Sequence, residues 1–160
     1  MLPDRDRPNI YTHQQRGLAV LLGWATGSIV TGIYWWQQPA DSSAQRFWQS
    51  LGSQFAIWGL IDLILAIGGL RDASAKAPRL AAGNITPAKA NRDANTVQTI
   101  LTINAILDVF YMLTGLWLIR QFPRRPAITG AGWGVLIQGA FLFLLDTLFA
   151  RAISRHPRLP

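Results

Sequence analysis

The sequence predicts an all-α protein that crosses a membrane four times, as a four-transmembrane-helix bundle. Half of its 160 residues are hydrophobic and only 14% are charged, well below the roughly 25% that is usual in soluble domains. Lys and Arg are also absent from four long stretches, residues 17–45, 47–70, 93–119 and 126–150. Each stretch holds an apolar run close to the roughly 20 residues that a helix needs to cross about 30 Å of hydrocarbon. We therefore expect a single integral membrane domain over residues 1–160.

The first span is expected over about residues 17–36. Thr12 and Gln15 have the spacing of a capping box before this span. The aromatic run Tyr34–Trp36 at its far end is typical of a membrane interface. Cleavage as a signal peptide is the alternative, since basic residues precede the apolar run. The charge-free stretch from Gly17 to Ala40 is much longer than the apolar core of a signal peptide, so we expect the span to be retained.

The other three spans are expected at about residues 53–70, 97–119 and 130–150. After the second span, residues 71–85 are rich in Ala, Ser, Gly and Pro, which predicts a linker. Thr86 and Pro87 then have the residue types of a helix N-cap and a first helical residue. The third helix should therefore begin in water, within a loop region of residues 71–96, and project from the bilayer before its span.

The basic residues indicate how the chain is oriented. With four spans both termini lie on one side, and 11 of the 15 Lys and Arg residues fall in the two tails and in residues 71–96. The other four, Arg46, Arg120, Arg124 and Arg125, lie on the opposite side. Because cytoplasmic segments carry the excess of Lys and Arg, we expect both termini to be cytoplasmic, in a cell inner (plasma) membrane.

Composition excludes several classes of function. The net charge of +7 does not indicate a nucleic-acid partner, because the basic residues flank the spans, where membrane lipids are the expected partners. The chain has no Cys, which excludes disulfides, thiolate catalysis and Cys-ligated metals. His13 and His156 lie at opposite ends of the chain without an evident third donor, so we expect no metal site. No catalytic or phosphate-binding motif occurs, and we expect no cofactor and no enzymatic activity.

The two halves of the chain show a weak internal similarity. Residues 54–66 match residues 138–150 at five of thirteen positions, and the first span matches the third at nearly the same offset. Because both helical hairpins would start on the same side, this predicts two tandem hairpins related by a parallel repeat about an axis along the membrane normal. Chance similarity between hydrophobic helices is the alternative.

Polar side chains inside the spans are the candidate functional residues. Intramembrane acids are rare, and they usually face a bundle interior or an aqueous cavity. Three aspartates occur here, each with an amide on the same helical face. The predicted buried polar face comprises Asp62, Asn104, Asp108, Gln138 and Asp146, with Gln54 and Tyr111 as further members.

Two roles are open for the aspartates. An ionised Asp at the centre of a span costs roughly 3 kcal/mol, and keeping a carboxyl of ordinary pKa neutral at pH 7 costs about 4 kcal/mol. The two states are thus close in free energy, and the spans contain no Lys, Arg or His as a counter-ion. The acids can therefore act as hydrogen-bonding groups that fix the helix register, or as a proton or cation site.

Glycines form a second pattern. Gly23 and Gly27 make one G-x-x-x-G sequence, and Gly130 and Gly134 make another. Such spacing lets helix backbones approach closely. We expect both pairs to pack inside the bundle, with a homo-oligomer interface as the alternative.

Residues of the last three spans form a further pattern over about residues 50–150. Its members are Trp58-Gly59, Asp62, Ile103-Asn104, Leu107-Asp108, Tyr111, Gly115, Gln138-Gly139, Phe141-Leu142 and Asp146. By these residues the chain resembles a family of small bacterial four-helix integral membrane proteins of unknown function. The resemblance implies the four-span topology and polar spans as defining features, and it implies no activity.

The predicted function is a non-enzymatic structural or accessory component of the membrane, alone, as a homo-oligomer or within a larger membrane complex. The alternative is a small proton- or cation-handling channel or carrier that uses the intramembrane aspartates. An intramembrane enzyme is disfavoured, because acids without a nucleophile or metal are an incomplete catalytic set.

Overall fold

The computed structural model describes residues 9–155, which form four long helices and no strand within that range. The helices are α1 (Ile10–Trp36), α2 (Ser43–Ala81), α3 (Pro87–Gln121) and α4 (Pro126–Ser154). All four are long and apolar enough to cross a membrane, which confirms the predicted fold class. Arg5, Arg7, His156 and Arg158, which entered the predictions of orientation and metal binding, lie outside the described residues.

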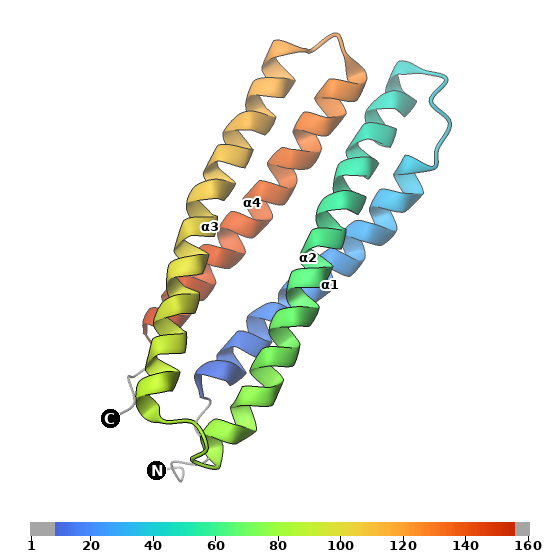
Figure 1. The fold of residues 1–160 in the computed structure, drawn as a ribbon. Helices are drawn as coiled ribbons and strands as arrows, with labels where there is room; N and C mark the ends of the chain where they lie inside the picture. Colours follow the sequence, from blue (N-terminus) through green and yellow to red (C-terminus); the bar gives the residue numbers. More distant parts are fainter. Residues whose placement is uncertain (1–8, 156–160) are drawn as a thin grey trace.

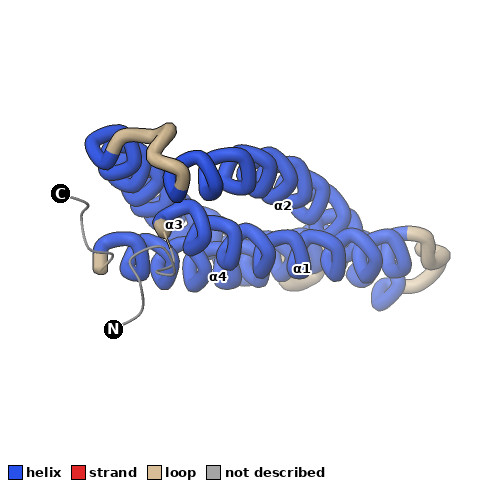
Figure 2. The backbone as a smooth tube through the Cα atoms, turned by 90° about the horizontal axis from the view of Figure 1, so that it is seen from below, coloured by secondary structure: helices blue, strands red, loops and turns tan. Residues whose placement is uncertain are grey.

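The helices form two hairpins, α1–α2 and α3–α4, that lie side by side (Figure 1). In Figure 1, α1 and α3 begin and α2 and α4 end at the lower end of the bundle, so the hairpins run parallel. The main contact between hairpins joins α2 to α4, and α3 packs closely only against α4. Seen from below, the helices are joined only by short loops (Figure 2).

Helix α1 begins earlier than its predicted span and has a different cap. The Asn9 side chain accepts a hydrogen bond from the Thr12 backbone N–H at 3.0 Å, which satisfies one of the free donors of the first turn. Thr12 is therefore inside the helix. Gln15 donates to the Ser74 hydroxyl on α2 at 3.1 Å. The predicted capping box of Thr12 and Gln15 is wrong because Asn9, a stronger capping residue, precedes it.

The predicted linker over residues 71–85 is also wrong in most of its length. Helix α2 continues to Ala81, and the chain leaves it through Gly83 at φ 75°, a left-handed conformation that glycine adopts without strain. Alanine is the best helix former, and the segment contains several. Ala73 is also fully buried in the core at the lower end of the bundle, so tertiary packing supports the extension. Pro78 lies so near the end that the helix tolerates it.

Helix α3 begins as predicted. The Thr86 side chain accepts from the Lys89 backbone N–H at 3.3 Å, and Pro87 is the first helical residue. Helices α2 and α3 have 39 and 35 residues, so at 1.5 Å per residue they are about 58 and 52 Å long. Both exceed the roughly 30 Å of hydrocarbon. Each is therefore longer than a single crossing of the membrane requires.

Each hairpin is closed by an equivalent contact between glycines. A Cβ atom on Gly32 would lie 2.7 Å from the carbonyl oxygen of Gly52, and one on Gly115 would lie 2.6 Å from that of Gly132. The reverse distances, from Gly52 and Gly132, are 2.6 and 2.8 Å. Glycine lets the two backbones approach this closely because it has no Cβ.

These contacts establish the register of the internal repeat. Gly115 follows Gly32 by 83 residues, the offset expected for the first helices, but Gly132 follows Gly52 by 80. A further pair, Gly59 and Gly139, also differs by 80 residues, and each packs against the first helix of its own hairpin. The predicted offset for the second helices was 84 residues, one helical turn too long. Matching polar residues suggested that offset, whereas the packing follows the glycines.

The two G-x-x-x-G sequences have different environments. Gly130 packs against the Phe47 backbone, and a Cβ on Gly134 would lie 2.5 Å from the Gln54 Cβ atom. Gly23 and Gly27 are exposed, and a Cβ there would meet no described heavy atom within 4 Å. The prediction of internal packing is therefore confirmed for α4 and wrong for α1. The reason is that α1 turns its other small-residue face, which includes Gly32, toward α2.

This difference predicts opposite responses to the same substitution on one helix. Gly32→Ala should lower the free energy of unfolding by about 1 to 3 kcal/mol, because the new methyl group meets the α2 backbone. Gly27→Ala should be neutral or stabilising by up to about 1 kcal/mol, because it adds helix propensity in open space. Denaturation of the purified protein in detergent measures both, and equal effects would contradict the observed rotation of α1.

Candidate functional site

Three buried aspartates meet between the helices. Asp62 on α2, Asp108 on α3 and Asp146 on α4 are 2%, 3% and 8% exposed. Asp146 interacts electrostatically with both other acids, and Asp62 interacts with Asp108. One carboxyl oxygen of Asp62 and one of Asp108, Oδ2 in each, is buried without a hydrogen-bond partner among residues 9–155. The structure thus buries all three acids that the sequence indicated, within range of one another's charge.

The glycine contacts explain why these acids point inward. Asp62 follows Gly59 by three residues, so the two share a helical face. Asp108 precedes Gly115 by seven residues, or two turns, and Asp146 follows the close-packed glycine at position 139 by the same interval. A face that packs against a neighbouring helix therefore carries the carboxyl groups to the bundle interior.

Gln138 belongs to a separate, satisfied network. Its Oε1 atom accepts from the Trp24 indole N–H at 2.7 Å, and its Nε2 atom donates to the Ser28 hydroxyl at 3.3 Å. The Trp24 ring also stacks on Phe141 with 3.9 Å between ring centroids. These contacts join α1 to α4 across the two hairpins. Gln138 is therefore a link between hairpins, although the sequence grouped it with the acids.

The remaining predicted polar residues lie outside the interior. Asn104 is exposed, because the side of α3 toward α2 is not closely packed, yet its side chain hydrogen-bonds to Asp146. Gln54 is half-buried beside Gly134. Tyr111 is exposed, and its ring packs edge-on against Trp58 with 5.1 Å between centroids. The predictions that Asn104 and Tyr111 are buried are therefore wrong, because α3 packs closely only against α4, whereas the place of Asn104 beside an acid is as expected.

Sequence reasoning missed three polar contributors: Gln14 and Ser28, which are buried, and Trp24, which is half-buried. Trp24 stands in an apolar run where a tryptophan gives no distinct signal. Ser28 lies on the buried face of α1 with Ala25 and Gly32, a spacing that could have marked it. Gln14 precedes the predicted span but is inside the longer helix that forms.

A cavity of about 270 Å³ lies beside the acids and is lined by all four helices. Its polar lining residues are Gln14, Asp72, Asn104 and Asp146, and the rest of its wall is mostly Leu, Ile, Val and Phe. Gln14 is 6% exposed, and its Nε2 atom has no hydrogen-bond partner in the described part of the chain. The cavity therefore connects Asp146 with Asp72, an exposed acid close to the lower end of the bundle.

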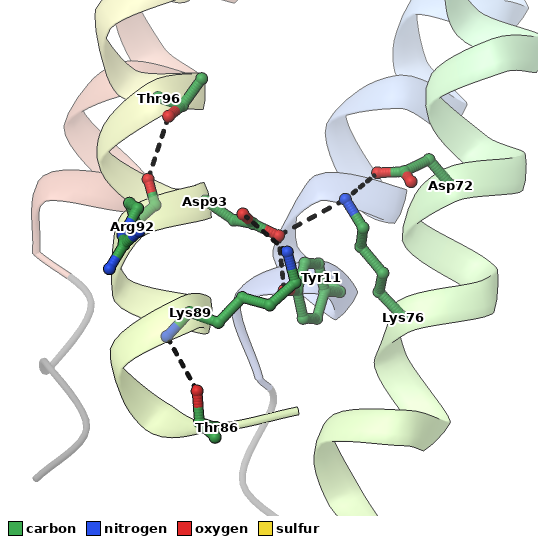
Figure 3. Close-up of polar contacts among 8 residues, drawn as sticks. All are labelled: Tyr11, Asp72, Lys76, Thr86, Lys89, Arg92, Asp93 and Thr96. Atoms are coloured by element: carbon green, nitrogen blue, oxygen red, sulfur yellow. Dashed lines mark hydrogen bonds and ion pairs between the residues drawn. The ribbon is translucent and has the colours of Figure 1, made fainter. Parts of the chain in front are cut away.

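A cluster of charged residues joins three helices at that end (Figure 3). The Tyr11 hydroxyl donates to an Asp93 carboxyl oxygen at 2.9 Å. Lys76 Nζ lies 2.7 Å from an oxygen of Asp72 and 3.4 Å from one of Asp93. Lys89 Nζ lies 3.9 Å from the other carboxyl oxygen of Asp93. This polar cluster links α1, α2 and α3 at the lower end of the bundle.

The polar cluster shifts the pKa values of its members. The hydrogen bond to Asp72 raises the pKa of Lys76, against the opposing effect of burial. Burial would raise the pKa of Asp93, but hydrogen bonding from Tyr11 and the charge of Lys76 outweigh it and lower that pKa. Burial and the Asp93 carboxylate raise the pKa of Tyr11. Asp93 thus stays ionised, and Lys76 stays charged.

The buried acids do not form a metal-binding group. Among residues 9–155, no three His, Cys, Asp or Glu side chains lie close enough together to hold a metal ion. The acids interact as charges through the bundle, and their chemistry is that of carboxyl groups that can gain or lose a proton.

Fold and site together define an α-helical bundle of four helices, each long and apolar enough to cross a membrane, with three buried aspartates. The chain belongs to a family, described as Family of unknown function (DUF6992), whose model matches residues 20–147. This range includes all three buried aspartates. No curated protein and no solved structure matches the chain.

The network around Gln138 makes a prediction about stability. Trp24→Phe keeps a ring against Phe141 but removes the donor to Gln138, so it should lower the free energy of unfolding by about 1 kcal/mol or more. Trp133→Phe is the matched control, because Trp133 is exposed on α4. Unfolding in detergent tests both variants. An equal cost for the two would show that the indole hydrogen bond contributes nothing.

Proposed function

We propose that this protein is a non-enzymatic, multi-pass membrane protein whose buried aspartates take up and release protons. The observation that carries the proposal is the pair of unpartnered carboxyl oxygens on Asp62 and Asp108, which interact electrostatically with each other and with Asp146. A buried carboxylate without a partner is unstable relative to its protonated form. Because these groups lie in the spans, a change in their protonation is a change of charge within the membrane.

The hydrogen bonding favours this role over a purely structural one. An acid that fixes the helix register does so by hydrogen bonds, and a buried oxygen without a partner weakens the packing that it is meant to secure. The interhelical network that does satisfy its atoms is that of Trp24, Ser28 and Gln138. The link between the hairpins is therefore carried by Gln138, whereas Asp62 and Asp108 each keep one oxygen without a described partner.

The choice of a proton over a metal cation follows from the ligand geometry. A hard cation such as Ca²⁺ needs six or more oxygen ligands, and no described group of three acidic or imidazole side chains converges to hold one. A proton needs a single carboxyl oxygen. The cavity beside Asp146 supplies a route between that acid and the end of the bundle.

A structural or accessory component is the second candidate function. It is favoured by the exposed face of α1 that carries Gly23 and Gly27, since small residues let a second helix approach closely. On this proposal the chain assembles as a homo-oligomer or within a larger membrane complex, in contact with membrane lipids. The buried acids would then have a structural role within that assembly.

For the orientation, we propose that both termini are cytoplasmic, in an inner (plasma) membrane. The basis is the distribution of basic residues, 11 against 4. A reporter that fluoresces only in the cytoplasm should be bright when fused at the carboxyl end or inserted at Ala82, in the link between α2 and α3. Truncation and fusion at Ser43, where α2 begins, should be dark. A bright Ser43 fusion would reverse the proposed orientation.

Proton flux tests the acid cluster directly. Purified protein in lipid vesicles should dissipate an imposed pH gradient, recorded with an internal pH-sensitive dye. Asp62→Asn and Asp108→Asn should each reduce the rate at least about tenfold, because an amide keeps the side-chain shape but exchanges no proton. Asp41→Asn is the matched control, since Asp41 is exposed in the link between α1 and α2.

Two outcomes would contradict the proton proposal. One is a gradient held as long by vesicles with the protein as by empty vesicles. The other is an equal loss of flux from the exposed Asp41 change, since that acid lies outside the cluster.

A further inference from the structure

We propose that the cavity beside Asp146 binds a lipophilic amine in its protonated form, with the ammonium group paired to Asp146. The preferred occupant has an apolar body that carries one hydrogen-bond acceptor, which receives the free N–H of Gln14. The inference rests on the proposed function in one respect, because Asp146 must be able to give up its proton.

The wall of the cavity selects an apolar body. Most of the lining side chains are hydrocarbon, including Leu18, Leu21, Leu101 and Leu145, and Phe149 closes one side. Cavities with mostly apolar walls bind apolar molecules, and a cavity of about 150 Å³ is enough for benzene. With about 270 Å³, the present cavity has room for a benzene ring and a short chain. A ligand with an apolar body would contact this wall more fully than water does.

The charge of the wall selects a cation. Asp146 and Asp72 are its acidic members, and none of the described lining residues is Lys, Arg or His. The nearest base of the polar cluster, Lys76, is held by Asp72 and Asp93 at 2.7 and 3.4 Å. An ammonium ion thus finds an acid with no competing base, whereas a carboxylate ligand would be repelled.

Gln14 gives an independent indication of a ligand. Its side chain lines the cavity, is more than nine-tenths buried, and has an Nε2 atom without a hydrogen-bond partner among the described residues. A buried donor left unpaired costs about 1 to 3 kcal/mol. An ether or hydroxyl oxygen in the ligand would remove this cost once the Gln14 side chain turns its buried Nε2 atom toward the cavity. Asn104, which hydrogen-bonds to Asp146, holds that carboxyl from the α3 side.

Access to the cavity is available between α2 and α3. These two helices are not closely packed against each other, and the lining residues Leu65 and Ile100 on them are exposed. A lipophilic amine concentrates at the membrane, so it can reach this side from the lipid. When it binds, the Asp146 carboxyl releases its proton to water and the ammonium group replaces that proton as the positive partner. Binding and proton release are therefore coupled.

Isothermal titration calorimetry of the full chain in detergent tests the inference with 4-phenoxybutylamine. This probe has a ring, an ether oxygen and one ammonium group, and it should bind saturably with one molecule per chain. Asp146→Asn should weaken binding at least tenfold, because the ammonium loses its counter-charge, while Asp41→Asn leaves it unchanged. Two matched probes separate the contribution of the ether oxygen from that of the ammonium group. 5-Phenylpentylamine, with CH₂ in place of the ether oxygen, should bind more weakly, and 4-phenoxybutyrate should not bind.

A second variant tests the inference independently, in case Asp146→Asn does not fold. Val97 lines the cavity, and Val97→Phe should block binding by filling it while leaving all acids in place. The inference is overturned if 4-phenoxybutyrate binds as well as the amine, or if both variants, folded by thermal unfolding, bind the amine as the parent does. Proton flux without any amine binding also overturns it but leaves the proposed function standing. Absence of both flux and binding would remove both.

Discussion

Close contact between helix backbones is the constraint on which the rest of this structure depends. Helices in hydrocarbon gain no hydrophobic free energy by leaving lipid, so they are held by dispersion contacts and a few polar links. Gly32 with Gly52, and Gly115 with Gly132, provide such contacts at equivalent places in the two hairpins. Because these contacts set the rotation of each helix, they also decide which side chains face the interior.

The position of the acids follows from that rotation. Asp62, Asp108 and Asp146 share faces with the glycines, so packing two hairpins through α2 and α4 gathers three carboxyl groups without a basic partner. The same arrangement leaves α3 loosely packed against α2, and the cavity lies beside that side of the bundle. Other contacts stabilise the bundle: the hydrogen bond between Trp24 and Gln138, and the polar cluster that includes Tyr11, Lys76 and Asp93.

Local and composition-based predictions were the most successful. The four helices and the N-cap at Thr86 appear as predicted, because apolar length and capping chemistry depend on residues close together in the chain. The linker after the second span was mispredicted, since buried Ala73 extends α2 through packing that composition does not reveal. The placement of Gly23 and Gly27 failed for a related reason, because a G-x-x-x-G sequence does not state which face of a helix meets a neighbour.

The sequence by itself determined that four apolar helices form and that three of them carry an acid within their apolar length. It could do so because the thickness of a bilayer and the cost of charge in hydrocarbon act on each segment separately. Only the tertiary structure decided that Gln138 bonds to Trp24 and Ser28, that Gln14 and Asp146 share a cavity, and that Asn104 is exposed. Those relations join helices that are far apart in the chain, and they depend on helix rotations that the glycine contacts set to within a fraction of a turn.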